Sequence, residues 1–278
     1  MTVNMDNPHS VSKTNHFDSR YWNDLVLIEQ KKHHIDPVLG RYKSDEFIRL
    51  VRAWIQSLEN KTVLKTDLRE EAYGEDEILF SLSLKNSTVV GIDIAEETVR
   101  RATRKQEERS LVHRYITSDV RGLPFKDNVF DVILSTSTLD HFNCEDDFIQ
   151  SLRELKRVLR PHGSMIITIN NKCNLVFYVL LKLERLFGLT PYPVESFTPT
   201  RLKKIFNSLD LNIQNEDCII HIISPINTIL LLLRKFFANN MADEIAKKCV
   251  FFAYRLGNKK KLNLLTGWFI ALKCSKEF

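Results

Sequence analysis

Short apolar runs alternate with longer mixed segments through the middle of the chain. The short runs are rich in β-branched residues, and in the longer segments apolar residues recur every three or four positions. The first pattern is typical of buried strands and the second of amphipathic helices. Strands that alternate with helices favour a parallel sheet with right-handed crossovers. We expect strands at residues 62–68, 87–94, 111–117, 131–135 and 165–169.

Several helical segments carry start and stop signals. Residues 145–159 form a strong apolar stripe, and Pro161 favours the end of that helix. Ser44 can cap the helix that follows it. Thr198 before Pro199 is typical of a cap with proline at the first helical position. We expect helices at residues 45–58, 75–84, 96–108, 145–159, 175–187, 199–208, 226–237 and 243–254.

After residue 171 the regular alternation ends, and the helical segments become more apolar. Two further strands are expected, at 211–221 and 263–274. We predict an N-terminal extension with one helix (1–60) and one α/β domain (61–278). That domain comprises a core at 61–172, an elaboration on the substrate side at 173–262 and the last strand at 263–274.

Composition narrows the class of protein. The chain has 278 residues, of which 44% are hydrophobic, enough for one large α/β core. No run approaches the ~18 consecutive apolar residues that span a bilayer, and the first residues lack the layout of a signal peptide. The five cysteines are scattered without a Cys-x-x-Cys pair. We therefore expect reduced thiols in a cytoplasmic protein, without a disulfide framework or a metal site.

Charge is distributed unevenly along the chain. Residues 171–278 hold 16 Lys and Arg against 8 Asp and Glu, whereas the net charge of the whole chain is +5. A basic region beside apolar helices is compatible with peripheral contact to an anionic membrane, and we expect no nucleic-acid partner. An ordinary solvated face is the alternative.

Two acids stand at the ends of predicted strands. Asp93 ends the second strand and Asp119 follows the third. Ligands of doubly wound sheets bind at the carboxyl ends of strands, where an acid after the second strand can accept ribose hydroxyls. A structural acid that caps the next helix is the alternative for Asp93.

These acids lie within motifs of a known family. The motifs are Val-Val-Gly-Ile-Asp-Ile at 89–94, Asp-Val-Arg-Gly-Leu-Pro-Phe at 119–125 and Phe-Asp-Val-Ile-Leu-Ser at 130–135. The segment resembles the core of a class I S-adenosylmethionine-dependent methyltransferase. The resemblance implies an α/β fold with a Rossmann-like, doubly wound, mostly parallel seven-stranded sheet. The last two strands would form an antiparallel pair, with a helical N-terminal extension and helical C-terminal insertions around the sheet.

The resemblance also implies a cofactor site for S-adenosyl-L-methionine. Asp93 and Ile94 would lie at the ribose. The carboxylate of Asp119 would accept a hydrogen bond from the adenine amino group, and the backbone amide of Val120 would donate one to a ring nitrogen. Ser135 opens the loop that faces the reactive end of the cofactor.

His141 is the candidate catalytic base. It can take a proton from the acceptor as a methyl group arrives, and Asp140 is a weaker candidate for the same role. Packing against the adenosine, or an ordinary loop position, are alternatives for His141. Methyl transfer from a sulfonium depends mainly on positioning and a dry pocket, so it does not require a base.

The loop after the first strand departs from the family. The family pattern is Asp-x-Gly-x-Gly-x-Gly, whereas residues 65–74 read Lys-Thr-Asp-Leu-Arg-Glu-Glu-Ala-Tyr-Gly with one glycine. Either the loop takes another path, or the cofactor site is altered or lost. Asp67 or Glu70 can hold the methionine amino group. Arg69 is unfavourable near a sulfonium unless it points away or reaches the carboxylate.

The leading hypothesis is a methyltransferase that acts on a small or lipid-like acceptor. A catalytically silent relative that serves as a binding or scaffold protein is the second hypothesis. A third, an NAD-dependent oxidoreductase, rests on the shared sheet and on Tyr178 and Lys182. Their four-residue spacing resembles that of the short-chain dehydrogenase catalytic pair and places both on one helix face, and a chance match is the alternative. We expect a cytoplasmic location, with membrane association left open.

Overall fold

The computed structural model describes most of the chain. The described residues are 19–29, 35–74, 78–82, 84–109, 111–142, 144–174, 179, 182, 186, 195–221, 224–236, 239–259 and 262–277. They include a seven-stranded sheet in the order β3-β2-β1-β4-β5-β7-β6. The strands are β1 (Thr62–Thr66), β2 (Thr88–Asp93), β3 (Arg114–Thr117), β4 (Phe130–Thr136), β5 (Leu159–Asn170), β6 (Leu211–Ile219) and β7 (Phe269–Lys276).

Strand direction follows the predicted doubly wound pattern. β1 pairs with β2 and β4 in parallel, and β2–β3 and β4–β5 are also parallel. β7 lies between β5 and β6 and is antiparallel to both. The α/β fold class is confirmed, and so is the antiparallel last pair that the family resemblance implied. Strand order reverses between β1 and β4, which is where such sheets bind ligands.

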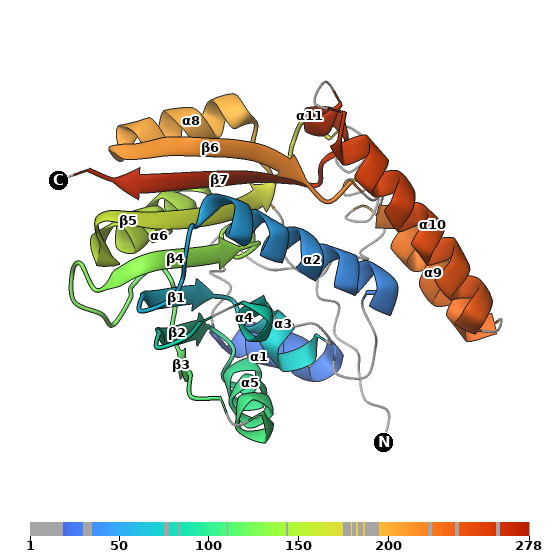
Figure 1. Ribbon diagram of the computed structural model, residues 1–278, viewed down its shortest axis with the longest axis horizontal. Helices are drawn as coiled ribbons and strands as arrows, with labels where there is room; N and C mark the ends of the chain where they lie inside the picture. Colours follow the sequence, from blue (N-terminus) through green and yellow to red (C-terminus); the bar gives the residue numbers. More distant parts are fainter. Residues whose placement is uncertain are drawn as a thin grey trace, which may run out of the picture.

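Helices cover both faces of the sheet (Figure 1). They are α1 (Ser19–Glu29), α2 (Pro37–Trp54), α3 (Arg69–Tyr73), α4 (Ile78–Ser81), α5 (Glu96–Glu108), α6 (Glu145–Val158), α8 (Pro199–Ser208), α9 (Ser224–Phe236), α10 (Asn239–Gly257) and α11 (Asn263–Thr266).

Alternate strand residues divide the core into two layers. Leu64, Ile133 and Ile167 pack in one cluster with apolar residues of α6 and α8. Their neighbours Val63 and Val132 belong to a second cluster with α2, α9 and α10. Successive strand side chains point to opposite faces, so strands covered on both sides need continuous apolar runs.

The second helix begins eight residues before its predicted start. The side chain of Asp36 accepts a hydrogen bond from the Val38 backbone amide at 2.9 Å, and Pro37 occupies the first helical turn. An aspartate cap followed by proline is a stronger start signal than Ser44, which lies buried inside the helix. The predicted helix at 45–58 is therefore corrected to Pro37–Trp54.

Two other predicted boundaries were wrong. The helix expected at 75–84 is replaced by the short α3 and α4, because Gly74 is extended and its amide closes the end of α3 on the Glu70 carbonyl. The last strand was expected at 263–274, but α11 occupies its start and β7 begins at Phe269. The Gly267 amide closes α11 on the Asn263 carbonyl, and extended backbone follows.

The helix expected at 175–187 lies largely outside the described residues, as do Tyr178 and the polar segment at 1–16. In the part of the chain that is described, no helix is both long and apolar enough to cross a bilayer. All five cysteines are free.

Candidate functional site

A cavity of about 340 Å³ opens at the carboxyl ends of β1, β2 and β3. Its floor comes from the residues that follow these strands, and one wall comes from the loop after β4. Leu25 and Val26 of α1 line it from the other side. The Glu97 backbone amide at the start of α5 donates to Asn23 of α1 at 3.1 Å, which anchors that helix. The volume falls within the ~300–1,000 Å³ typical of small-molecule pockets.

Asp93 lies in the cavity wall at the end of β2. One carboxylate oxygen accepts the Ala95 backbone amide at 2.8 Å, and the other accepts the Leu68 backbone amide at 2.9 Å. Burial raises the pKa of Asp93, while these two donors oppose that shift. Each oxygen keeps a second lone pair, so the carboxylate can still accept two hydroxyl groups. No side chain forms an N-cap hydrogen bond in α5, but Asp93 holds the backbone amide of Ala95, the residue before that helix, so it also has a structural role.

Asp119 also lines the cavity, together with Val120, but its carboxylate is already engaged. The Arg121 guanidinium donates to both oxygens, with the shortest contact from Nη2 at 2.6 Å. Nη1 of the same side chain donates to Asp147 at 2.9 Å. Hydrogen bonding to Asp119 raises the pKa of Arg121. A nucleobase whose amino group bonds to Asp119 must therefore displace the Arg121 guanidinium. Asp147 offers that guanidinium a second partner.

Ser135 is fully buried and lies outside the cavity lining, whereas Ile94 is in it. The hydroxyl of Thr66 at the end of β1 donates to Ser135 Oγ at 2.9 Å and lies 2.7 Å from Thr138 Oγ1. Thr66 and Thr138 both line the cavity. Ser135 therefore contacts one lining hydroxyl, that of Thr66, which in turn contacts Thr138.

His141 lines the cavity beside an aromatic side chain. Its ring meets Trp22 of α1 edge to face, with centroids 5.6 Å apart. Nε2 lies 4.0 Å from Oδ1 of Asp140. Asp140 is fully buried and accepts the Asn170 backbone amide, and burial raises the pKa of this acid. Only His141 of the two faces the cavity, so Asp140 can act on a ligand through His141 alone.

The departing loop keeps one feature of a glycine-rich turn. Asp67, the first residue after β1, has a φ of 65° and lines the cavity. This left-handed conformation costs roughly 1–2 kcal/mol in residues other than glycine, and aspartate tolerates it better than most. Its side chain accepts the Arg69 backbone amide at 2.7 Å. Burial, Glu70 and Asp93 together raise the pKa of Asp67.

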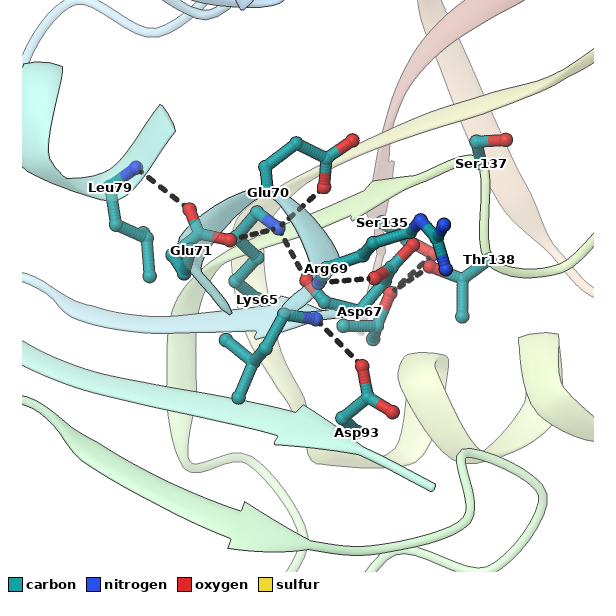
Figure 2. A network of polar contacts seen from close by, with 12 residues as sticks. Lys65, Asp67, Arg69, Glu70, Glu71, Leu79, Asp93, Ser135, Ser137 and Thr138 are labelled. Carbon is teal, nitrogen blue, oxygen red and sulfur yellow. Dashed lines mark hydrogen bonds and ion pairs between the residues drawn. The ribbon is translucent and has the colours of Figure 1, made fainter. Parts of the chain in front are cut away.

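Beneath this loop lies a buried charge cluster, which Figure 2 shows from close by. Lys65 in β1 is fully buried, and its Nζ donates to Glu71 at 2.8 Å and to the backbone carbonyl of Asp67. Glu71 is also fully buried and accepts the Leu79 backbone amide at the start of α4 at 3.1 Å. The lysine therefore ties β1, the Asp67 turn and α3 together.

Glu70 joins the cluster to the cavity rim. One of its oxygens accepts from Nζ of Lys43, a lining residue, at 3.1 Å. The other is 3.7 Å from Lys65 Nζ and has no hydrogen-bond partner. Burial disfavours the charge on Glu70, but Lys43 and Lys65 outweigh it and lower its pKa to about 2. Burial likewise opposes the charge on Lys65, and Glu71, Glu70 and Asp67 raise its pKa.

Sequence reasoning found most of the lining acids but missed the groups that engage them. Lys65 stands in an otherwise apolar strand with Glu71 six residues later, which was a usable signal of a buried ion pair. Arg121 follows Asp119 by two residues, which is close enough for a local ion pair. Lys43 and Thr138 had no sequence signal, because only the fold brings them to the cavity.

Comparison with protein families gives a match at residues 71–167 to a family described as methyltransferase domain. The match begins at Glu71, inside the departing loop. Demethylmenaquinone methyltransferase of Thermus thermophilus is 37% identical over 79 residues, covering 28% of this chain and 34% of that protein. An uncharacterized protein of Methanocaldococcus jannaschii is 26% identical, covering 45% and 50%. The chain thus spans half or less of the length of these curated relatives.

Solved structures with the same fold extend over more of the chain. A putative sarcosine dimethylglycine methyltransferase from Galdieria sulphuraria aligns with a TM-score of 0.58 at 14% identity, covering 84% of this chain and 86% of that one. The cyclase SpnF aligns with a TM-score of 0.60 at 13% identity, covering 94% and 96%. At these identities the likeness concerns the fold alone.

The strand order, the cavity at the switch point and the family match agree. The chain has the class I methyltransferase fold, and its residues 71–167 match the methyltransferase-domain family.

Proposed function

We propose that this protein is an S-adenosylmethionine-dependent methyltransferase with a small or lipid-like acceptor. The observation that carries the proposal is the free accepting capacity of Asp93 in a cavity at the carboxyl end of β2. Bound S-adenosylmethionine supplies a methyl group on a positively charged sulfur. All other roles below belong to side chains of this chain.

The lining residues fit such a ligand from end to end. Asp93, with Ile94 beside it, accepts the ribose hydroxyls. Asp119 accepts a hydrogen bond from the adenine amino group once the Arg121 guanidinium leaves Asp119 and pairs with Asp147 alone. Val120 lines the cavity beside Asp119. Asp67 is the lining carboxylate on the β1 side, and it faces the amino group of the methionine part of the cofactor. Arg69 and Lys43 offer cations for the carboxylate of that methionine part.

His141 has the place required of a base at the acceptor. It lies in the cavity wall next to Trp22, and the buried Asp140 stands behind its ring. In this arrangement His141 takes the acceptor proton and Asp140 stabilises the imidazolium that forms. The apolar wall formed by Leu25, Val26 and Ile35 favours an acceptor with an apolar body. The relative named demethylmenaquinone methyltransferase supports a lipid-like acceptor.

Calorimetric titration with S-adenosylmethionine tests the proposal. We expect binding by the full chain, weakened at least ~tenfold in Asp93→Asn, because a hydrogen bond to a charged group contributes about 1.5–3 kcal/mol. Asn retains an oxygen for one of the two backbone donors and turns its amide nitrogen toward the other, so thermal unfolding is used to check that the variant is folded. Glu96→Gln, at an exposed neighbouring acid, is the matched control. Absence of heat with folded protein would refute the proposal.

A catalytically silent binding protein remains the second candidate. It is favoured by Lys65, which occupies the strand position where the family pattern has its acid. A cyclase that shares the fold also shows that fold alone does not fix methyl transfer. Release of S-adenosylhomocysteine in the presence of a lipid extract separates the two. Binding without release, over extracts of several chain lengths and headgroups, identifies the silent protein.

We propose a reducing, cytoplasmic compartment, which the five free cysteines support.

A further inference from the structure

Two helices project from the edge of the molecule beyond β6 and β7. α9 and α10 pack side by side and extend away from the sheet (Figure 1). Their inner faces are anchored, since Leu230, Ala246 and Ala253 are buried in the same cluster as Leu39 and Tyr42 of α2. We call this pair the α9–α10 hairpin. Because the inner face is buried against α2, the same residues of each helix always face outward.

The outer side of the hairpin exposes large apolar side chains. Ile229, Leu232 and Phe236 lie on one face of α9, and Phe236 is 68% exposed. On α10, Phe251 and Phe252 are 65% and 60% exposed. Large apolar side chains rarely gather on a surface that faces only water. This side of the molecule is therefore suited to an apolar partner.

Cations accompany these apolar side chains. Lys235 lies over the ring of Phe236 at 5.6 Å, and Arg255 over that of Phe251 at 5.8 Å. Lys248 is also exposed on α10. Residues 224–261 contain eight Lys and Arg against two Asp and Glu. Apolar side chains among surplus cations complement the boundary of an anionic bilayer, where acyl chains lie just below negative headgroups.

The hairpin is also connected to the rim of the cavity. Arg234 of α9 forms an ion pair with Asp36, the cap of α2, and Asn227 accepts the Asp36 backbone amide at 2.7 Å. The residue before Asp36 is Ile35, which lines the cavity and is 40% exposed. The inner side of the hairpin therefore lies close to the cavity rim.

We propose that the α9–α10 hairpin docks this protein on a membrane surface rich in anionic lipid. The apolar outer side enters the headgroup–acyl boundary, and the flanking cations contact lipid phosphates. Because the hairpin contacts Asp36, docking holds the cavity rim within a short distance of the bilayer, which shortens the route of a lipid-like molecule from the membrane to the cavity. The α9–α10 hairpin lies outside the cavity lining, so membrane docking can be measured without cofactor or turnover.

Sedimentation with vesicles tests docking. We expect the full chain to pellet with vesicles of phosphatidylcholine and phosphatidylglycerol, to pellet less with phosphatidylcholine alone, and to be released by high salt. Replacement of Lys235 and Lys248 by Ala should lower the partition coefficient by roughly thirtyfold, at about fivefold per cation. Phe251→Ser with Phe252→Ser should lower it at least about tenfold.

Val112→Ser is the matched control. Val112 is 93% exposed and precedes β3 at the opposite edge of the sheet, so its loss should leave pelleting unchanged. Thermal unfolding checks that each variant is folded. Failure of the full chain to pellet with anionic vesicles overturns the proposal. So does self-association that the phenylalanine variants abolish without any vesicle binding, because the outer side then joins two copies of the chain.

Discussion

At the scale of single residues, the loop after β1 is held by buried ion pairs where the family pattern has glycines. A glycine-rich turn lets backbone approach a ligand because it lacks side chains. Here Asp67 keeps the left-handed conformation, and Lys65 holds its carbonyl from beneath. The side chains of Glu70 and Glu71 turn into the cluster and neutralise that lysine. The turn is thus stabilised by buried charge instead of by glycine.

This arrangement makes Lys65 important for stability. Lys65→Met leaves the fully buried Glu71 without its partner, which typically costs about 3–5 kcal/mol. We expect a loss of that size in the free energy of unfolding, measured by urea denaturation. Lys65→Met combined with Glu71→Leu should recover most of it. A single variant as stable as the parent protein would show that the pair is not needed for the fold.

Arg121 is the second residue that decides how the site works. In Arg121→Ala the carboxylate of Asp119 loses its guanidinium donors, so a base amino group meets no competitor. We expect the affinity for adenosine to rise about tenfold, measured by calorimetry. Arg100→Ala, which removes an exposed pair with Glu97, is the control. A fall in affinity instead would show that Arg121 itself contacts the base.

At the scale of elements, the start of α2 joins two parts of the molecule. Asp36 caps the helix with one carboxylate oxygen and pairs with Arg234 of α9 through the other. A single buried side chain thereby fixes both the first turn of α2 and the base of the α9–α10 hairpin. The cavity-lining Ile35 lies beside it in sequence.

Two substitutions separate these roles of Asp36. Asp36→Asn keeps an oxygen for the cap and loses the ion pair, whereas Asp36→Ala loses both. We expect Ala to lower the free energy of unfolding by about 1 kcal/mol more than Asn, the usual contribution of a cap. Hydrogen exchange should show faster opening of α9 in both variants, because Arg234 is released from α2. Equal stability of the two variants would contradict the cap.

At the scale of the whole molecule, periodicity predicted more than local signals did. Every described strand lies at or near its predicted place. The buried strands β1, β2 and β4 were predictable because strands covered on both faces must be continuous apolar runs. Helix starts were less certain: the Asp36–Pro37 start preceded the apolar stripe on which the prediction rested. The turn after Thr266 likewise depends on tertiary contacts. The Trp268 backbone amide donates to the carbonyls of Ile219, the last residue of β6, and of Ile220.

The candidate site was predictable only in part, for a physical reason. Acids at strand ends can be located from sequence because strand ends meet at one edge of the sheet. What those acids bind in the folded chain depends on side chains from distant segments. Lys43 comes from α2 and Asp147 from α6, and neither could be assigned to the cavity from spacing alone.

Buried acids and histidines give the molecule opposing pH dependences. Burial lowers the pKa of His113 and His221 below the ordinary 6.5. The unfolded chain therefore binds these protons first, and their contribution to stability is lost as pH falls below about 6.5. Burial raises the pKa of Asp140, so the folded chain binds that proton first and stability is gained as pH falls toward the ordinary 3.8.

Single variants should separate the two effects. His113→Phe keeps an aromatic ring beside Phe80 and removes a titrating group, so its free energy of unfolding should fall less than that of the parent between pH 7 and 5. Asp140→Asn keeps an oxygen for the Asn170 amide and removes the proton that the folded chain gains, so its free energy of unfolding should fall more than that of the parent as the pH is lowered toward 3.8. Each change in slope is at most about 1.4 kcal/mol per pH unit, the limit for one proton. Urea denaturation at stepped pH measures both, and slopes that shift in the same direction would show that one of the two groups is not buried as described.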